Sequence, residues 1–452
     1  MAADRVFDDN QAVWLEGAAA APPPAPLPGD TTADVAIIGG GFTGVSTAYH
    51  LSRRFPGRGV VLLEARRLAN GASGRNGGMM LNGVTEPDDP DALVREHELT
   101  SGAMDAIEAL IREHGLRVRY RRDGCLRVQT TARAAEEAHA AVERLAGRRP
   151  LRFLRGAELD ARLRIHGVHG AVLDPTEGML NGVDLVRAMQ PLLAAQGVRV
   201  HEQTPVVRVR EGATIEVVTT RGTVRAGAVV LATNGYTPRL GYFRSGLLPV
   251  ISHVIATAPL APELLAEAGL GELAGFSDDR PRLAYCTIDP EHRLVFGGGA
   301  TAAYGYRFGN ATAWPARLGD LPTGVLRGEL VARFPALAGV ELRHRWSGPL
   351  GLTRTRRCAM GVRGAHRNVY YALGYSGHGV VLANLAGRVL TDLYAGDHEP
   401  WRGHAFYMAR PSGIPPEPFR WTGYQLYTRL TGRSPWKHPP PAPPPAPPPA
   451  PP

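Results

Sequence analysis

A continuous apolar run that ends directly in three glycines constrains the fold of this chain more than any other feature. Residues 34–38 (DVAII) show no polar alternation, which predicts a strand that is buried on both faces. A helix is expected over 43–54, and residues 60–63 (VVLL) predict a second strand parallel to the first. Strand, glycine-rich turn, helix and strand form a βαβ unit, so the sequence predicts an α/β fold on a parallel sheet.

The turn after this first strand carries a phosphate-binding pattern. Gly39, Gly41 and Gly44 fit G-x-G-x-x-G, and Glu64 follows the second expected strand. The first glycine permits a tight turn, the second lets backbone N–H groups approach a pyrophosphate, and the third lets helix and strand pack closely. The helix N-terminus adds a positive dipole, and Glu64 can accept the ribose hydroxyls. We interpret this segment as a dinucleotide site.

Two further glycine-rich loops indicate which dinucleotide binds. Residues 70–78 (NGASGRNGG) follow the second strand. A nicotinamide cofactor does not require a second glycine-rich loop at this point, whereas an extended flavin cofactor does. The alternative is a surface loop that connects domains. Residues 374–380 (GYSGHGV) open a helix whose positive end can stabilise the negative charge of a reduced flavin. His378 in this loop is equally consistent with an ordinary histidine that hydrogen-bonds to backbone.

Periodicity places the remaining elements. Residues 381, 385, 389 and 393 are apolar, which predicts a helix that ends near Gly396. Helices are also expected over 91–113 and 132–145, and strands over 126–129, 198–209, 215–218, 228–232 and 368–372. Residues 439–452 are almost entirely proline and predict a polyproline II or disordered tail.

Composition limits the class of protein. The formal charge is +9, but Lys437 is the only lysine among 51 cations and the arginines are scattered, with residues 117–122 the nearest approach to a cluster. We therefore expect a solvated surface and no nucleic-acid partner. Three cysteines without metal-type spacing, no signal pattern and no long apolar run predict a soluble cytoplasmic protein without membrane contact.

The three loops, in this order, resemble the D-amino-acid-oxidase superfamily of FAD enzymes, particularly its gamma-glutamylputrescine, glycine and sarcosine oxidase branch. The resemblance covers about residues 14–396, through Trp14, DVAIIGGGFTGVSTAYHL, GASGRNGG, DPTEGMLNGVDLVRAM, VVLATNGYT, RLVFGGG and YYALGYSGHGV. It implies noncovalent FAD and a two-domain α/β structure: a Rossmann-like FAD domain of glutathione-reductase type with a mixed-sheet substrate domain. The cofactor contacts carried over are Gly39, Gly41, Phe42, Thr43, Gly44, Glu64, Ala65, Arg66, Ser73, Arg75, Asn76, Gly77, Gly78, Met79, Val207, Thr233, Asn234, Gly348, Gly374, Gly377, His378, Gly379 and Val380.

The resemblance also divides the chain and suggests residues that face the substrate. We expect an extended lead-in over 1–29, an FAD domain over 30–88, 165–238 and 340–400, a substrate domain over 89–164 and 239–339, and an extension over 401–438. His253, Tyr285 and Trp346 are the substrate-facing candidates. Ordinary core packing is the alternative for each, because strand aromatics are usually buried.

The implied activity is oxidation of a small amine or N-substituted amino acid at its C–N bond, with hydride transfer to flavin N5 and reoxidation by oxygen or another acceptor. Thr355 and Cys358 depart from the family pattern, which has Asp and Pro there, so the backbone path beside the flavin is expected to differ. Two alternatives stay open at this stage. One is a flavoprotein that modifies a tRNA base side chain, and the other is a binding role for the polyproline tail on an SH3-like groove.

Oxygen activation is a further question. Sarcosine oxidases place a lysine over the flavin, and Lys437 is too near the C-terminus to serve. If His253 replaces it, protonation is required, and flavin reoxidation should accelerate as the pH falls towards ~6.

Overall fold

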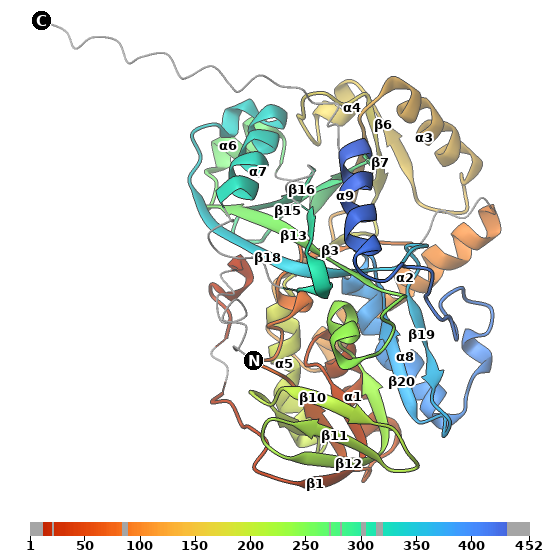
Figure 1. The fold of residues 1–452 in the computed structure, drawn as a ribbon. Helices are drawn as coiled ribbons and strands as arrows, with labels where there is room; N and C mark the ends of the chain where they lie inside the picture. The colour runs from red at the N-terminus through yellow and green to blue at the C-terminus, as the bar shows by residue number, and fades with distance from the viewer. Residues whose placement is uncertain are drawn as a thin grey trace, which may run out of the picture.

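The structure is a computed structural model, and it describes residues 12–19, 22–83, 89–270, 273–280, 283–299, 304–312 and 320–431. Two sheets organise the chain, and they occupy opposite halves of the molecule (Figure 1). Helices α1, α5 and α8 accompany the first sheet, whereas α3, α4, α6 and α7 accompany the second (Figure 1). The fold is therefore the two-domain α/β arrangement that the sequence predicts.

The first sheet has a parallel centre. Strand β1 (Thr31–Ile38) lies between β2 (Val60–Leu63) and β12 (Thr223–Leu231), and it is parallel to both. The predicted strand over 60–63 has the predicted bounds. The remaining strands of this sheet are β9 (Arg199–His201), β10 (Val206–Arg210), β11 (Ile215–Thr219), β19 (Ala359–Arg363) and β20 (Val369–Leu373).

Helices α1, α5 and α8 pack on one face of this sheet, and α2 packs against α8. Helix α1 follows β1, and α8 follows β20, as the glycine-rich turns predict. Ser46 on α1 donates a hydrogen bond to the Asn384 carbonyl on α8, which shows how closely the two helices approach. The bounds are α1 (Phe42–Arg54), α2 (Pro90–Glu113), α5 (Gly182–Ala195) and α8 (Gly379–Ala395). The predicted helices over 43–54 and 91–113 are confirmed within one residue, and the helix predicted to end near Gly396 is α8, which ends at Ala395.

The second sheet runs in the order β17-β13-β16-β15-β14-β5-β7-β6, and β18 pairs with β13. Its strands are β5 (Cys125–Gln129), β6 (Arg152–Leu154), β7 (Gly170–Asp174), β13 (Leu248–Thr257), β14 (Gly275–Asp278), β15 (Ala284–Ile288), β16 (Leu294–Gly298), β17 (Tyr304–Tyr306) and β18 (Leu342–Leu352). The helices of this half are α3 (Ala132–Arg144), α4 (Ala157–Asp160), α6 (Pro262–Ala268) and α7 (Asp320–Arg333).

The two faces of the second sheet belong to different cores. Val254, Val295 and Trp346 pack in the core that contains α1, α2, α5 and α8. Ile255 and Phe296, their neighbours along the strands, pack in a second core with residues of α6 and α7. Because side chains alternate between faces along a strand, one face of this sheet is directed at the first domain and the other at its own helices.

Some expected boundaries are wrong. The single strand predicted over 198–209 is broken into β9 and β10, because Gln203 has a positive φ of 49° and Pro205 has no N–H to donate. Strands β7 and β18 pair in the second sheet, although their residues fall in ranges expected for the FAD domain. Helix α2, expected in the substrate domain, contributes Met104 and Ile107 to the core of the first domain.

The N-terminal lead-in is not simply extended. Residues Val13–Leu15 form a short 3-10 helix, and Trp14 is 1% exposed within the first core. A small sheet follows nearby, made of β3 (Met79–Met80), β8 (Gly178–Leu180) and β4 (Tyr120–Arg121). Glu16 forms an ion pair with Arg293 and a hydrogen bond with His344, so the N-terminal segment joins the second domain to the glycine-rich loop of the first.

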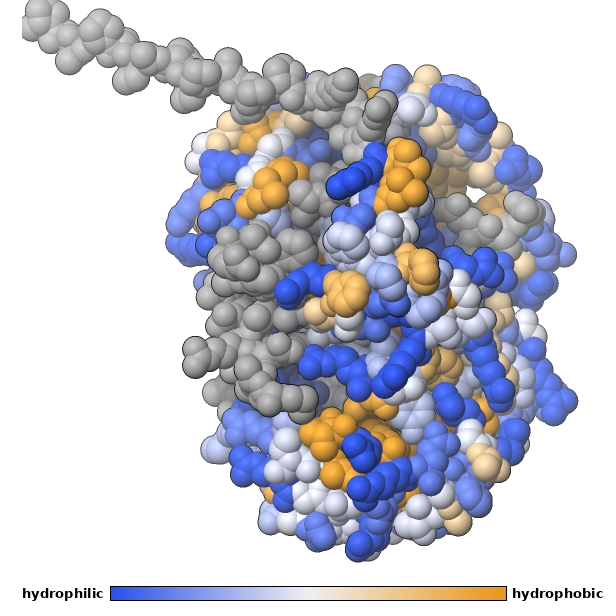
Figure 2. All heavy atoms as spheres, in the orientation of Figure 1, coloured by the Kyte–Doolittle hydropathy of each residue, from blue (hydrophilic) through white to orange (hydrophobic). Residues whose placement is uncertain are grey.

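The C-terminal part ends in helix α9 (Phe419–Thr431), whose exposed apolar side chains include Phe419, Leu426 and Leu430. Figure 2 shows apolar residues over this helix on the face turned to the viewer. The polyproline segment 439–452 lies outside the described residues. Among the helices of the described chain, none has the length and hydropathy that a membrane-spanning segment requires.

Candidate active site at the interface of the two domains

The first glycine-rich turn has the geometry of a phosphate cradle. A Cβ atom on Gly41 would lie 2.6 Å from Ser73 Oγ, and one on Gly44 would lie 1.8 Å from the Gly39 carbonyl oxygen. Gly39 has a φ of +111°, where side chains are disfavoured. Gly41 is the N-cap of α1 and has no side chain of its own to cap this helix end. The residues therefore fit a pyrophosphate that accepts hydrogen bonds from the helix N-terminus.

Glu64 lies beside this turn, as predicted. Its carboxylate accepts hydrogen bonds from the backbone N–H groups of Gly40 at 2.7 Å and Arg66 at 2.9 Å. Burial raises the pKa of this carboxyl group, whereas the two backbone donors lower it. A carboxylate has more acceptor positions than these two bonds use, so Glu64 retains capacity for ribose hydroxyls.

The second glycine-rich loop is fixed at both ends. Ser73 Oγ accepts a hydrogen bond from the Phe42 N–H at 2.9 Å, which ties the loop to the start of α1. Asn76 accepts from the Gly78 N–H at 2.7 Å and donates to the Ser73 carbonyl at 2.8 Å. Arg75 is buried, and its Nε donates to the Asn70 carbonyl at 2.7 Å. This segment is not a surface connection, and the alternative of a domain-connecting surface loop is wrong.

The third loop brings a second helix N-terminus to the same place. His378 is the N-cap of α8, and Ser376 and Gly377 have positive φ angles of 51° and 106°. Tyr375 Oη lies 2.6 Å from Thr43 Oγ1 in the first turn of α1. Because β1 and β20 are both parallel to β12, α1 and α8 begin at the same edge of the sheet. Ligands of open parallel sheets bind at this carboxyl edge.

Two of the substrate-facing candidates lie on the face of the second sheet that is directed at these loops. Trp346 Nε1 donates a hydrogen bond to the Arg75 carbonyl at 2.9 Å. The ring of Tyr285 packs against Gly77, where a Cβ atom would lie 2.5 Å from its Cε2. Tyr285 Oη also lies 3.2 Å from Ser252 Oγ, and burial raises its pKa to about 12. Tyr285 is therefore a neutral hydroxyl at physiological pH.

His253 does not share this face. It pairs with Ser347 in the β13–β18 register, whereas Val254 pairs with Trp346. Strand alternation therefore directs His253 to the face of Ile255, which packs in the second core. Burial lowers the pKa of His253 to about 4. The expectation that it becomes protonated near pH 6 beside the flavin is wrong on both counts.

Most of the other expected contacts lie in segments that border these loops. Asn234 accepts a hydrogen bond from the Gly374 N–H at 2.9 Å, and Thr233 Oγ1 lies 2.9 Å from Thr237 Oγ1. A Cβ atom on Gly348 would lie 2.8 Å from Arg75 Cβ. Met79 starts β3 directly after the second loop, Ala65 is exposed beside Glu64, and Gly379 and Val380 form the first turn of α8. Val207, on the edge strand β10, is 45% exposed. Its contact with the cofactor stays a prediction.

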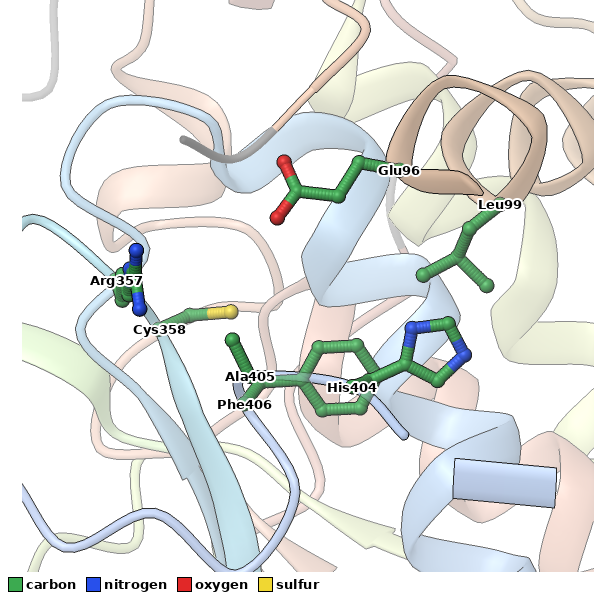
Figure 3. A pocket seen from close by; sticks show the side chains of 7 residues that line it. All are labelled: Glu96, Leu99, Arg357, Cys358, His404, Ala405 and Phe406. Atoms are coloured by element: carbon green, nitrogen blue, oxygen red, sulfur yellow. The ribbon is translucent and has the colours of Figure 1, made fainter. Parts of the chain in front are cut away.

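A small cavity lies between α2, the residues before β19 and residues 404–406, but it does not suit a substrate. It has a volume of about 20 Å³, which holds roughly one water molecule. Cys358, Glu96 and His404 contribute side chains to it, together with Leu99, Arg357, Ala405 and Phe406 (Figure 3). Burial raises the pKa of the Cys358 thiol to about 12, so it is a protonated thiol rather than a nucleophile. Cys358 therefore fills space where the family pattern has a proline.

Sequence reasoning missed the partners that support these side chains. Ser252 is one, because a serine in an apolar strand gives no signal until the register places it beside Tyr285. The indole of Trp14 is another. Its Nε1 donates to the Asn76 carbonyl at 2.7 Å, and its ring lies 3.0 Å from the position of a Cβ atom on Gly78. Trp14 belongs to the resemblance motifs, but only the fold shows that it supports the second loop.

Comparison with known proteins agrees with this geometry. Residues 34–393 match the family model described as DAO, FAD dependent oxidoreductase. The chain is 31% identical over 384 residues to gamma-glutamylputrescine oxidoreductase of Escherichia coli (strain K12), covering 81% of this chain and 85% of that one. It is 27% identical over 372 residues to glycine oxidase of Geobacillus kaustophilus (strain HTA426), covering 80% and 92%. The crystal structure of glycine oxidase from Geobacillus kaustophilus superposes with a TM-score of 0.71 at 23% identity, over 84% of this chain and 100% of that chain. With its glycine cradle and two helix N-termini at one sheet edge, the chain belongs to the DAO family of FAD-dependent oxidoreductases.

Proposed function

We propose that this protein oxidises the C–N bond of a small amine or an N-substituted amino acid, with noncovalently bound FAD. The observation that carries the proposal is the convergence of the N-termini of α1 and α8 with the Tyr285 and Trp346 face of the second sheet. The names of the relatives support it, because gamma-glutamylputrescine and glycine both contain an amine. When bound, FAD supplies the acceptor for a hydride from the carbon next to nitrogen and passes the electrons to oxygen or another acceptor.

The roles of the chain's own residues follow from their positions. The start of α1 holds the pyrophosphate, and Glu64 holds the ribose. The dipole of α8 favours negative charge at its N-terminus, and His378 there is neutral because burial and two nearby arginines lower its pKa to about 4. Tyr285 and Trp346 would form the wall opposite these helix starts and would hold the amine in one orientation, which lowers the entropic cost of the reaction.

A nucleic-acid substrate is not favoured. Three of the four arginines in the densest run, residues 117–122, form ion pairs within the protein. Arg119 pairs with Asp184, Arg121 with Asp123, and Arg122 with Asp105 and Glu108. The three cysteines are free and buried, which supports a reducing compartment such as the cytoplasm.

Purified protein tests the proposal directly. It should carry a yellow cofactor that acid precipitation releases into the supernatant as FAD. Colour that stays in the pellet would contradict the noncovalent assignment, and a protein that cannot be loaded with FAD would contradict the cofactor. Anaerobic mixing with primary amines, N-methyl amino acids and ω-amino acids should bleach the flavin band for at least one class. Bleaching by none of them would contradict amine oxidation.

A further inference from the structure

A second cavity lies on the first domain, away from the helix starts that we assign to the cofactor. It has a volume of about 400 Å³, within the range of about 300–1000 Å³ that small-molecule sites occupy. Helices α1 and α8 line it, and we call it the α1–α8 cavity. The side chains that determine its chemistry are Tyr49, His50, Arg53, Arg54, Arg388 and Asp392. None of them is among the expected contacts of the cofactor or the substrate.

Two of the three guanidinium groups of this cavity are held by aromatic rings. The guanidinium carbon of Arg53 lies 5.3 Å from the ring centre of Tyr49, and that of Arg388 lies 5.5 Å from the ring centre of Trp401. Both rings are buried, so each cation rests on a rigid support. A group that is already positioned loses less conformational entropy when a ligand binds. One guanidinium from each helix is therefore preorganised for a ligand.

The third guanidinium, that of Arg54, is neutralised within the protein. It forms an ion pair with Asp392 and a longer one, of 3.7 Å, with Asp397. Asp392 also accepts a hydrogen bond from the Trp401 indole at 3.0 Å. The carboxylate that lines the cavity is thus already engaged by two strong partners.

Arg53 and Arg388 keep most of their charge. Arg388 Nε lies 4.0 Å from Asp392, at the outer limit of an ion pair, and Arg53 lies 3.4 Å from Glu113 in a pair whose side chains are both about half exposed. Exposed pairs contribute little and are readily exchanged for another anion. Burial, followed by the charges of Arg388 and Arg53, lowers the pKa of His50 to about 4. The electrostatic potential at this imidazole is therefore positive.

We propose that the α1–α8 cavity binds a small molecule with two or more negative charges, either a phosphate ester or a polycarboxylate. Each guanidinium can form two parallel hydrogen bonds with one phosphate or carboxylate group. Arg53 and Arg388 come from different helices, so a ligand with a single carboxylate engages only one of them fully. The inference goes beyond the proposed function, because the cavity contains none of the residues that we assign to FAD or to the amine.

The test uses FAD-loaded protein, in which the pyrophosphate site of the cofactor is already occupied. Pyrophosphate, citrate and acetate are titrated by calorimetry at constant ionic strength. Pyrophosphate or citrate should bind at one site per chain, at least tenfold more tightly than acetate. The tighter of the two identifies the ligand as a phosphate ester or a polycarboxylate.

Variants locate the site. Arg388→Gln should raise the Kd of the tighter probe at least tenfold, and Arg388→Lys, which keeps the charge without the planar fork, should fall between it and the wild type. The Arg388 side chain is 64% exposed, so the variant should fold. Arg53→Gln should cause a similar loss from the other helix. Arg133→Gln removes the same charge from the exposed surface of α3 and should change the Kd by less than twofold.

His50 reports on the bound anion. A negative charge in the cavity favours the protonated imidazole, so a saturating probe should raise the pKa of His50 in an NMR titration and leave that of His253, in the second domain, unchanged.

Four results overturn the inference: no binding of pyrophosphate or citrate, acetate binding as tightly as both, a Kd that Arg388→Gln does not change, or binding that leaves the pKa of His50 unchanged. The proposed function is tested separately, because bleaching of the flavin by amines does not enter these measurements.

Discussion

At the scale of single residues, the glycines of the first turn are defined by what surrounds them. Gly44 cannot carry a Cβ because the Gly39 carbonyl occupies that position, so this glycine is required for folding. Gly41 differs, because the atom that a Cβ would meet is the Ser73 hydroxyl oxygen at the end of a short side chain. Serine can rotate away, and the fold can survive a substitution at Gly41.

We therefore predict that Gly41→Val folds but loses FAD. The valine displaces Ser73 Oγ from the Phe42 N–H and covers the start of α1, where the pyrophosphate must approach. The Kd for FAD, measured by fluorescence titration of the apoprotein, should rise at least tenfold with little change in far-ultraviolet circular dichroism. Gly102→Val, on α2 with no atom within 4 Å of its Cβ, is the matched control. If Gly41→Val binds FAD with wild-type affinity, the assignment of this turn to the pyrophosphate is wrong.

A second prediction concerns His253 and acid stability. Its folded-state pKa of about 4 lies below the ordinary value of 6.5, so the unfolded chain binds more protons between these limits. Stability therefore rises with pH through this window and is lost as the pH falls from about 7 to about 4. For His253 alone the loss between pH 7 and pH 5 is about 2 kcal/mol.

Urea unfolding of the wild type and of His253→Gln measures this effect. The variant should have a shallower fall in unfolding free energy between pH 7 and pH 5. Stopped-flow reoxidation of the reduced enzyme should show the same pH profile for both proteins, since His253 is neutral at pH 6. If the reoxidation rate rises towards pH 6 only in the wild type, His253 takes part in the reaction of the reduced flavin with oxygen.

At the scale of elements, the site is made by two helices that begin at one edge of one sheet. Helix α8 starts at a histidine whose side chain makes no capping hydrogen bond with the first N–H groups of the helix. Tyr375, in the loop before α8, contacts Thr43 of α1 and keeps the two helix starts together. This pairing of elements explains why the third glycine-rich loop is required although it makes no part of the phosphate fingerprint.

We predict that His378→Asp lowers the flavin midpoint potential. A carboxylate at the start of α8 repels the negative charge that a reduced flavin gathers, whereas the neutral histidine does not. A penalty of about 1.4 kcal/mol corresponds to ~30 mV for a two-electron couple. Equilibration with reference dyes measures the shift. His378→Asn, which matches the shape of aspartate without its charge, should differ from the wild type by much less. Equal shifts in both variants would exclude the electrostatic explanation.

At the scale of the whole molecule, the N-terminal segment joins the two domains next to the second glycine-rich loop, residues 70–78. Trp14 supports Asn76 and Gly78 in the first domain, and Arg119 donates to the Trp14 carbonyl at 3.2 Å. Two residues later, Glu16 pairs with groups on the second sheet. The position of the loop relative to the substrate wall thus depends on residues that are distant in the sequence.

Replacing Trp14 should weaken cofactor binding, because its indole supports the second glycine-rich loop rather than contacting the cofactor. Trp14→Phe loses the hydrogen bond to the Asn76 carbonyl, at a cost of about 1 kcal/mol, and keeps most of the packing. Trp14→Leu loses both and should cost about 3 kcal/mol. Thermal unfolding of the wild type and both variants measures these stability costs. The increase in Tm that added FAD produces should be smaller in the variants than in the wild type. If FAD stabilises all three proteins equally, Trp14 supports the fold alone.

The elements whose signals are local are predictable from the sequence. The strand over 60–63 has the predicted bounds, and α1 and α8 begin within one residue of the glycine-rich turns that predict them. Apolar runs, helical periodicity and glycines at turns act over a few residues. The first glycine-rich turn and the helix after it can therefore be predicted without knowledge of tertiary contacts. The family resemblance adds the second domain and the cofactor, because its motifs are distributed along almost the whole chain.

Only the tertiary structure decides which side chains meet. His253 and Tyr285 both lie in apolar strands and have comparable chemistry, yet strand register places one in the core behind the sheet and the other against the flavin loop. Ser252 carries no sequence signal, and only the tertiary structure brings its Oγ to 3.2 Å from Tyr285 Oη. Register is set by contacts between distant segments, and a shift of one residue turns every side chain to the other face. The sequence by itself therefore determines the cofactor and the class of chemistry, whereas the packing of the two sheets decides which residues face the substrate.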